Sequence, residues 1–461
     1  MSELPSGWNY FSLNDLGGLS GGKTPSKANP VFWSSPDVPW VSPKDMKRNL
    51  LEDAEDRISQ VAVAEASMAL YPAGSVLMVT RSGILQHTFP VALASAELTV
   101  NQDIKVLRPV EGIAPKFAFY LLKSHGGEIL SACSKDGTTV QSIDSEKLEA
   151  FQFPLPPFSE QTRITQKLDE LLAQVDTLKA RIDGIPALLK RFRQSVLAAA
   201  VSGRLTEEWR SAFFSEGAQE SSITGCSEDF AWPVVRLGEV ARDFSYGSSS
   251  KSQPIGDIPV LRMGNIQGGR LDWGDLVFSS DKEEIKKYSL QAGDVLFNRT
   301  NSPELVGKTA IYKGEQPAIY AGYLIRVRCG ETLAPEFLNY CLNSPQGRDY
   351  CWQVKTDGVS QSNINAKKLA DFRFGLPSVE EQKEIVRRVE QLFAFADQLE
   401  AKVTSAKGRI DHLTQSILAK AFRGELVPQD PNDEPASVLL ERIKAQCAAA
   451  PKVKRGRKAS A

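Results

Sequence analysis

The sequence predicts an α+β protein in which two similar globular domains are separated by two long helical segments. Three observations predict this class: an internal repeat, two coiled-coil stripes and an ordinary globular composition. Of the 461 residues, 42% are hydrophobic and 24% are charged, which is typical of folded domains rather than disordered chains. At roughly 150 residues per domain, the length suffices for about three domain-sized pieces.

The second half of the sequence repeats the first. From Asp136 to Leu205 the copies align at a constant offset of 221 residues without a gap. Identical residues mark the register: Asp136 and Asp357, Ile143 and Ile364, Phe151 and Phe372, Glu160 and Glu381, Gln194 and Gln415, and Gly203 and Gly424. A fixed period indicates a duplicated structural unit. We interpret the copies as one fold with diverged surfaces; a duplicated scaffold without functional division is the alternative.

Each copy ends in a helical segment with coiled-coil periodicity. The apolar residues alternate spacings of four and three: Ile164, Leu168, Leu171, Val175, Leu178 and Ile182, then Ile385, Val389, Leu392, Ala396, Leu399 and Val403. A seam with an average spacing of 3.5 residues is typical of coiled coils. One such stripe would be explained by packing on its own domain. Two equal stripes favour an antiparallel pair that holds the domains apart, with an internal pseudo-twofold axis.

The ends of these helices have recognisable signals. Gly184 and Pro186 are expected to interrupt the first helix. A further helix then follows in each copy, near residues 186–201 and 409–422, as part of a hairpin or a shared bundle. The glycines at 203 and 424 are plausible helix stops, and the residues at 378 and 381 form a capping-box pattern.

These signals divide the chain into five segments. We expect domain 1 at residues 1–155, a central helical segment at 156–211, domain 2 at 228–376, a C-terminal helical segment at 377–428, and a partly disordered tail at 429–461. The basic run at 452–458 could add nonspecific attraction to DNA.

Composition excludes several function classes. The 55 basic and 56 acidic residues nearly cancel, so any DNA binding must use local patches or charge from a partner. No stretch approaches the ~20 apolar residues of a membrane helix, and the N-terminus lacks a signal-peptide pattern. Six cysteines show no Cys-x-x-Cys spacing and three histidines lie far apart. We therefore expect a cytoplasmic protein with free thiols, no membrane segment and no metal site.

Two motifs suggest enzymatic chemistry but do not fit their sequence context. Residues 17–24 match the phosphate-loop pattern, which requires a helix opening at its lysine. Pro25 and Pro30 follow and would break that helix, so a flexible basic loop is favoured. Residues 155–158 resemble the tetrapeptide of DNA amino-methyltransferases, but Leu155 stands where an amide or carboxylate is needed. A turn leading into a helix is the simpler interpretation.

Candidate DNA-contact residues lie in polar loops after strand-like segments. Arg, Lys, Asn and Gln side chains can pair with base edges, and equivalent loops occur in both copies. The candidates are Lys44, Arg81 and Gln141 in domain 1, and Arg262, Asn298, Arg299 and Gln361 in domain 2. The alignment of Arg81 with Arg299 in the sequence is approximate.

The chain resembles the specificity (S) subunits of type I restriction-modification enzymes, and looks closest to the enterobacterial type IA group. The resemblance rests on residues 21–26 and 39–41 in domain 1, 261–266 and 293–299 in domain 2, 155–161 and 376–382 at the helix starts, and 191–197 and 413–426 near the helix ends. It extends from Trp8 to about Leu426. Pro157 and Ser378 differ between the two helix starts.

The resemblance implies a division of labour among subunits. Each target recognition domain would read one half of a split, asymmetric double-stranded DNA target, and the helices would fix the gap and bind two modification (M) subunits. Those M subunits carry S-adenosylmethionine and methylate adenine. Two restriction (R) subunits would add ATP- and Mg-dependent translocation and cleavage. This chain would hold no cofactor of its own.

Our hypothesis is therefore a noncatalytic DNA-recognition subunit that directs adenine methylation and restriction by its partners. One rival is a self-sufficient nucleotide-binding or DNA-methylating enzyme, supported only by the motif at residues 17–24. Another is a coiled-coil adaptor that never touches DNA.

Overall fold

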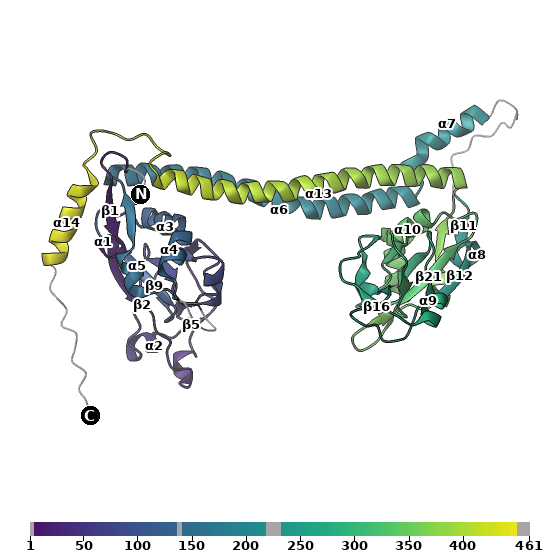
Figure 1. Cartoon of the computed structure of the whole chain (residues 1–461), viewed down its shortest axis with the longest axis horizontal. Helices are drawn as coiled ribbons and strands as arrows, with labels where there is room; N and C mark the ends of the chain where they lie inside the picture. The colour runs from purple at the N-terminus through teal and green to yellow at the C-terminus, as the bar shows by residue number, and fades with distance from the viewer. Residues whose placement is uncertain (1–3, 136–140, 218–231, 450–461) are drawn as a thin grey trace. The chain divides into compact units, whose positions relative to one another are not determined.

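A computed structural model describes residues 4–135, 141–217 and 232–449 of the chain. Contacts divide the chain into two compact units. Unit 1 comprises Met1–Ile182 with Ala406–Ala461, and unit 2 comprises Asp183–Ser405. Each unit therefore holds one globular domain and parts of two long helices (Figure 1).

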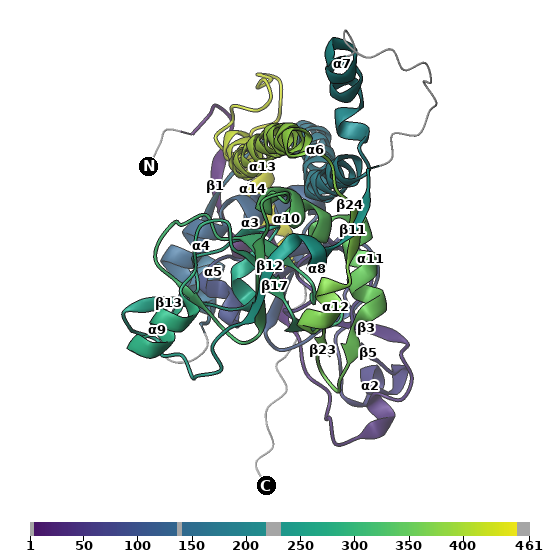
Figure 2. The ribbon, with the colours of Figure 1, turned by 90° about the vertical axis from the view of Figure 1, so that its right-hand side faces the viewer.

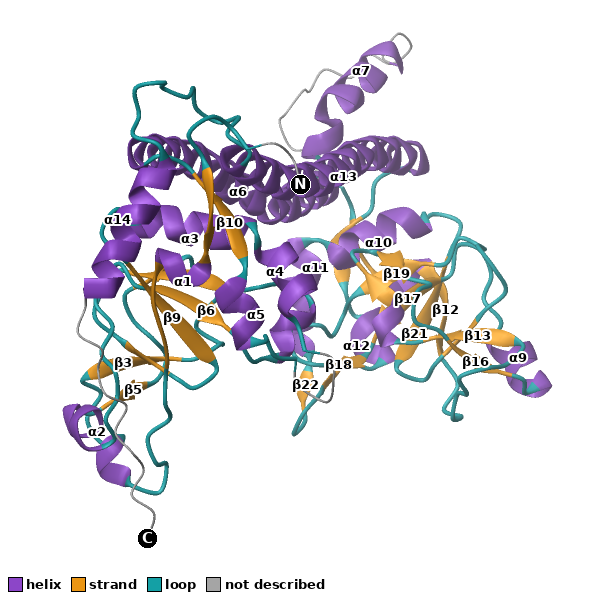
Figure 3. Cartoon of the chain, turned by 60° about the vertical axis from the view of Figure 1, so that its left-hand side comes forward, coloured by secondary structure: helices purple, strands orange, loops and turns teal. Residues whose placement is uncertain are grey.

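Domain 1 is built on a five-stranded sheet, drawn in orange in Figure 3. The strand order is β2 (Gly17–Gly21), β9 (Ile104–Pro109), β6 (Val76–Val79), β7 (Val91–Ala94) and β4 (Leu50–Leu51). All four residues of β6 are buried, as expected for a strand covered on both faces. The smaller sheets are β5 (Arg57–Ile58), β3 (Val38–Val41) and β8 (Thr99–Val100), and the pair β1 (Asn9–Ser12) with β10 (Gln152–Leu155).

The helices of domain 1 complete its core. They are α1 (Leu13–Leu16), α2 (Gln60–Glu65), α3 (Pro115–Ser124), α4 (Gly126–Cys133) and α5 (Ser145–Ala150), with short 3-10 turns η1 (Pro30–Phe32) and η2 (Gly83–Gln86). Helix α3 begins with Pro115 in its first turn, where the missing N–H has no intrahelical partner anyway. Its apolar face, including Phe117 and Leu121, is buried in the core of the domain.

Domain 2 has the same plan. Its main sheet has the order β12 (Ala241–Tyr246), β21 (Leu324–Cys329), β17 (Val295–Asn298) and β19 (Thr309–Ile311). The other sheets are β16 (Val277–Ser279), β13 (Ile258–Leu261) and β20 (Ile319–Tyr320); β11 (Val234–Arg236) with β24 (Arg373–Gly375); β14 (Ile266–Gln267) with β15 (Arg270–Leu271); and β18 (Thr300–Asn301), β23 (Ser362–Asn363) and β22 (Thr356–Asp357).

The remaining elements of unit 2 are helical. They are η3 (Arg204–Thr206), α7 (Glu207–Gly217), α8 (Leu237–Val240), η5 (Met263–Asn265), α9 (Lys282–Tyr288), α10 (Pro335–Asn343), α11 (Pro345–Val354) and α12 (Ala366–Ala370). The order β2-β9-β6-β7 in domain 1 matches β12-β21-β17-β19 in domain 2, and β5-β3-β8 matches β16-β13-β20. The repeat predicted from the sequence is therefore a repeat of fold.

Two helices of 44 residues each, α6 (Phe158–Val201) and α13 (Val379–Phe422), follow the two domains. The expected interruption of the first helix and the separate second helices are wrong, because both helices are continuous and Pro186 lies inside α6. Pro186 removes one backbone hydrogen bond, but Val196, Leu197 and Ala200 beyond it are buried in the core of unit 2 and hold the helix there. The predicted stops are confirmed, since Gly203 and Gly424 have φ values of 79° and 74°.

Within each unit the two helices run antiparallel, as Figures 1 and 2 show. In unit 1 the first part of α6 packs beside the last part of α13, with Lys179 Nζ 3.2 Å from Asp411 Oδ1. In unit 2 the last part of α6 lies beside the first part of α13, and Arg193 contacts Asp397 at 2.7 Å and Glu400 at 2.9 Å. The apolar stripes are buried or partly buried except at Leu178, which is 47% exposed.

The last helix, α14 (Ala436–Ala449), packs on domain 1, although the sequence predicted only a tail there. Its Ala436, Leu439 and Ile443 are buried, and the Ala436 N–H donates to the Gly7 carbonyl at 2.8 Å. The basic run at 452–458 lies outside the described residues. In the part of the chain that is described, no helix is both long and apolar enough to cross a membrane.

Candidate nucleic-acid interface

In domain 1 the structure brings together two of the predicted loops. Beyond the end of β6, the Ile143 N–H donates to the Thr80 carbonyl at 2.8 Å, and the Ser82 N–H donates to the Gln141 carbonyl at 3.1 Å. These bonds place Arg81 and Gln141 in adjacent segments of one edge. The Arg81 side chain is 61% exposed, and its Nε lies 3.0 Å from Asp103 Oδ1.

The equivalent edge of domain 2 has the same backbone pattern and different side chains. The Ile364 N–H donates to the Arg299 carbonyl at 2.9 Å, and β18 pairs with β23 just beyond. The Arg299 guanidinium lies 4.7 Å from the centre of the Tyr246 ring, and its Nη1 donates weakly to the Gly322 carbonyl at 3.4 Å. Stacking on an aromatic ring orients an arginine without neutralising its charge.

These backbone bonds settle the alignment that was approximate in the sequence. Ile143 and Ile364 are equivalent, so their acceptors Thr80 and Arg299 occupy the same place. Arg81 pairs with Ser142, and Thr300 pairs with Asn363 in the same way. Arg81 is therefore the structural equivalent of Thr300. Each domain therefore has an arginine at its own copy of this edge, at adjacent and not identical positions. We call the equivalent edges of the two domains the shared edge.

Two of the other predicted residues are held by nearby carboxylates. Lys44 contacts Glu55 at 2.9 Å and Asp56 at 3.1 Å. These hydrogen-bonded carboxylates raise the pKa of Lys44 to about 12. Arg262 lies 3.2 Å from Asp275 Oδ2. Both cations would have to exchange a local partner for a phosphate or a base.

Asn298 and Gln361 have opposite environments. Asn298 ends β17 and its side chain is fully buried, with neither amide atom hydrogen-bonded within the described residues. It is therefore not exposed to a ligand in this conformation. Gln361 is exposed in the turn between β22 and β23, and its carbonyl accepts from the Gly358 N–H at 2.8 Å.

Sequence reasoning missed the aromatic residues of this edge. Tyr246 is 41% exposed and Tyr323 is 49% exposed. The Arg299 N–H donates to the Tyr323 carbonyl at 3.0 Å, so Tyr323 directly adjoins the arginine. Strand patterns alone predict a buried tyrosine as readily as an exposed one, and only the packing separates the two.

The phosphate-loop match does not form a phosphate loop. Residues 17–21 are strand β2, paired along its length with β9. A Cβ at Gly22 would lie 2.0 Å from the Val100 carbonyl oxygen, so backbone packing explains that glycine. The expected flexible loop is wrong here, because this stretch is a paired strand. The residues at 155–158 end β10 and begin α6, which confirms the predicted turn.

Across residues 4–135, 141–217 and 232–449, no group of three His, Cys, Asp or Glu side chains is placed to hold a metal ion. Four cysteines, at positions 133, 329, 341 and 351, are free thiols that are buried or partly buried. Burial raises the pKa of the Cys351 thiol to about 11, which keeps it protonated at neutral pH and weakly nucleophilic.

Two copies of one α+β fold, each with its own polar edge, define a two-domain recognition protein. Residues 5–187 and 231–406 match the family model described as the type I restriction modification DNA specificity domain. The chain belongs to this family, and its class is the DNA specificity subunit of type I restriction-modification.

Curated relatives cover nearly the whole chain. The chain is 33% identical to the type I restriction enzyme EcoKI specificity subunit of Escherichia coli K12, and 32% identical to the StySPI specificity subunit of Salmonella potsdam. Each alignment covers 99% of this chain and 99% of the relative.

Solved structures share the fold. A chain from the work on complex assembly and conformational transition of the type I R-M system has a TM-score of 0.62 at 20% identity, over 92% of this chain and all of that chain. The HsdS subunit from Thermoanaerobacter tengcongensis has a TM-score of 0.55, also at 20% identity, over 92% of this chain and 98% of that subunit.

Proposed function

We propose that this chain reads a bipartite, asymmetric DNA target and directs adenine methylation and restriction by partner subunits. The observation that carries the proposal is the edge shared by the two domains. The backbone bonds of this edge are the same in both domains, but the side chains differ. Thr80, Arg81 and Asp103 in domain 1 correspond to Arg299, Thr300 and Tyr323 in domain 2. The same backbone arrangement with different side chains, which can hydrogen-bond to base edges, suits two different half-sites.

The contact residues that we retain first are Arg81 with Gln141 in domain 1, and Arg299 with Gln361 in domain 2. All four lie at or beside the shared edge, and arginine pairs bidentately with guanine as glutamine does with adenine. Lys44 and Arg262 follow, since each must leave a carboxylate. Asn298 comes last, because it is buried.

The long helices serve as the spacer in this proposal. We assign α6 and α13 as an antiparallel coiled coil that fixes the gap between half-sites and binds two M subunits. Exposed apolar residues support a partner on these helices: Leu178, Leu188, Phe395 and Leu413 are each at least 45% exposed. Covering such side chains with a partner removes apolar surface from water, which favours association.

The chemistry lies with the partners in this proposal. S-adenosylmethionine belongs to the M subunits, which flip a target adenine out of the duplex, and ATP with Mg belongs to two R subunits. The chain itself is noncatalytic and works where its partners and DNA are, in the cytoplasm.

Selection from a random DNA pool tests this function. The complex of this chain with the M subunit from the same source should enrich duplexes that carry two different short motifs at one fixed gap. The M subunit alone should enrich none. Assembly of the complex without any enriched motif would favour the adaptor alternative.

A further inference from the structure

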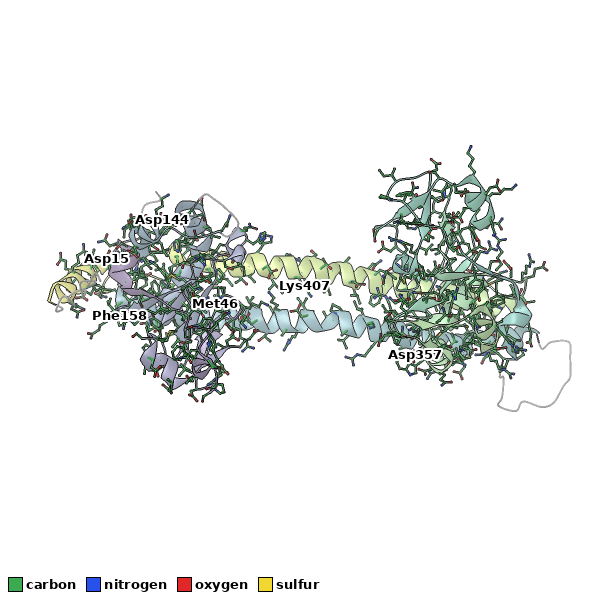
Figure 4. The ribbon with its side chains drawn as sticks, turned by 90° about the horizontal axis from the view of Figure 1, so that it is seen from below. Asp15, Met46, Asp144, Phe158, Asp357 and Lys407 are labelled. Carbon is green, nitrogen blue, oxygen red and sulfur yellow. The ribbon has the colours of Figure 1, made fainter. Side chains whose placement is uncertain are left out.

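A hairpin of domain 2 carries a fully exposed aliphatic side chain at its tip. Strands β22 and β23 form the hairpin, and Val359 in its turn has a relative exposure of 110%. Figures 2 and 3 show the hairpin on the side of domain 2 that faces away from α13. Figure 4 labels Asp357, the last residue of β22 before the turn.

The base of this hairpin is braced by polar contacts. Asp357 accepts from Ser362 Oγ at 2.5 Å and pairs with Lys355 at 2.6 Å, and these contacts hold the pKa of the Asp357 carboxyl below its usual range. Asn363 Nδ2 donates to Thr300 Oγ1 at 2.7 Å, which ties the hairpin to β18. These contacts therefore hold the tip of the hairpin in a defined position relative to β18.

The surroundings of the hairpin suit a nucleic acid. Arg299 immediately precedes β18, and Lys355 lies 4.3 Å from the centre of the exposed Trp352 ring. Lys368 donates to Thr356 Oγ1 at 2.8 Å, at the start of β22. The Lys355 side chain is only 8% exposed and is paired with Asp357, so the partly exposed cations beside the hairpin are Lys368 and Arg299. A two-stranded ribbon of this kind fits the major groove of B-DNA, which is about 12 Å wide.

The tip itself is polar except at one position. Ser360 and Gln361, which follow Val359, can donate and accept hydrogen bonds, whereas Val359 offers only methyl groups. Covering the exposed valine side chain with an apolar group lowers the free energy of the system, because apolar surface is removed from water. In the major groove that group is the C5 methyl of thymine.

We propose that Val359 contacts the methyl group of one thymine in the half-site read by domain 2. This inference rests on the proposed function and deepens it, because it names one base type and one specificity-determining side chain. The aligned residue in the first copy is Thr138, which lies outside the described residues, and the inference concerns domain 2 alone.

A double-substitution cycle tests the contact. In the target duplex, each thymine of the domain 2 half-site is replaced in turn by deoxyuridine, which lacks only the methyl group. The full complex with the M subunit should bind one such duplex about fourfold more weakly, the effect of one buried methyl group. Val359→Ala should lose a similar factor on the normal duplex and little more on that deoxyuridine duplex.

Ile255→Ala is the matched control, since Ile255 is 83% exposed in the same domain. It should leave the sensitivity to deoxyuridine unchanged. The inference would be overturned if the affinity losses from Val359→Ala and from deoxyuridine were additive, or if no deoxyuridine substitution weakened binding. A domain 2 half-site without thymine would also overturn it, as would an equal loss of affinity by Val359→Ala on unrelated DNA. Failure of the proposed function would look different, because wild-type complex would then select no split target at all.

Discussion

At the scale of single residues, two equivalent glutamates show how the copies have diverged. Glu160 and Glu381 each accept from a tryptophan, Trp8 at 3.0 Å and Trp232 at 3.1 Å. Glu381 also accepts from Thr206 at 2.7 Å and lies 3.5 Å from Arg210. Val427 aligns with Thr206 and has no hydroxyl, and Glu160 Oε1 has no hydrogen-bond partner among the described residues.

This difference predicts opposite effects of the same substitution. Burial raises the pKa of Glu160 above its usual value of 4.5. Its contribution to stability is therefore fully present below pH 4.5 and is lost as the pH rises through the raised pKa. Glu160→Gln keeps an acceptor for Trp8, so its unfolding free energy at pH 7 should equal or exceed that of the wild type, with less pH dependence above 4.5.

Glu381→Gln serves as the comparison in the same urea titrations. It removes the charge facing the partly buried Arg210 guanidinium and should lower the unfolding free energy by about 1–3 kcal/mol. A larger loss for Glu160→Gln than for Glu381→Gln would contradict this account of the two sites.

The arginines of the shared edge give a second prediction at this scale. Arg81→Ala and Arg299→Ala should each weaken recognition of only one half-site, and of different half-sites, by about 1–3 kcal/mol if the contact is bidentate. Binding to duplexes with one half-site scrambled at a time measures this. Equal loss on unrelated DNA would indicate phosphate contact instead.

Residue types in loops could be predicted from the sequence, but their surroundings could not. Arg81 is exposed, whereas Arg299 is only partly exposed and its Nε is buried without a hydrogen-bond partner among the described residues. Asn298 is buried, and Lys44 is held by two carboxylates. Such outcomes depend on contacts between segments distant in sequence, which no local pattern encodes. The capping box at Ser378 is only half formed for the same reason: Ser378 accepts from the Glu381 N–H, but the Glu381 carboxylate is engaged by Thr206 and Trp232.

At the scale of elements, the long helices show where local rules are overridden. Gly184, Pro186 and Gly408 all weaken a helix in isolation, yet α6 and α13 pass through them. Apolar side chains on both sides of these positions are buried, including Val175 and Leu189 on α6. Packing along the helix therefore outweighs about 1 kcal/mol for a glycine and about 3 kcal/mol for a proline.

Alanine at the two glycines tests this balance. A Cβ at either Gly184 or Gly408 meets nothing within 4 Å, so Gly184→Ala and Gly408→Ala should each stabilise the chain by up to about 1 kcal/mol. Chemical denaturation followed by circular dichroism measures the change. Gly203→Ala is the contrasting variant and should destabilise, because its φ of 79° is strained for any residue with a Cβ. Destabilisation by the helical glycine variants would contradict the argument.

At the scale of the whole molecule, the proposed spacer predicts that the length of the helices sets the gap between the two half-sites, as a ruler would. One helical turn of about four residues, or 6 Å, inserted in α6 near Val175 and matched in the facing part of α13, should lengthen the tolerated gap. The expected change is one to two base pairs at about 3.4 Å each. Selection of bound duplexes with variable gaps measures it, and an unchanged gap would refute the ruler.

The central claim is that this chain supplies sequence specificity to a methyltransferase. Single-molecule sequencing of adenine methylation in cells that express this chain with its M subunit tests it most directly, with each subunit alone as control. We predict a split, asymmetric methylated motif only when both are present. Methylation by this chain alone, or the same motif with the M subunit alone, would contradict the account.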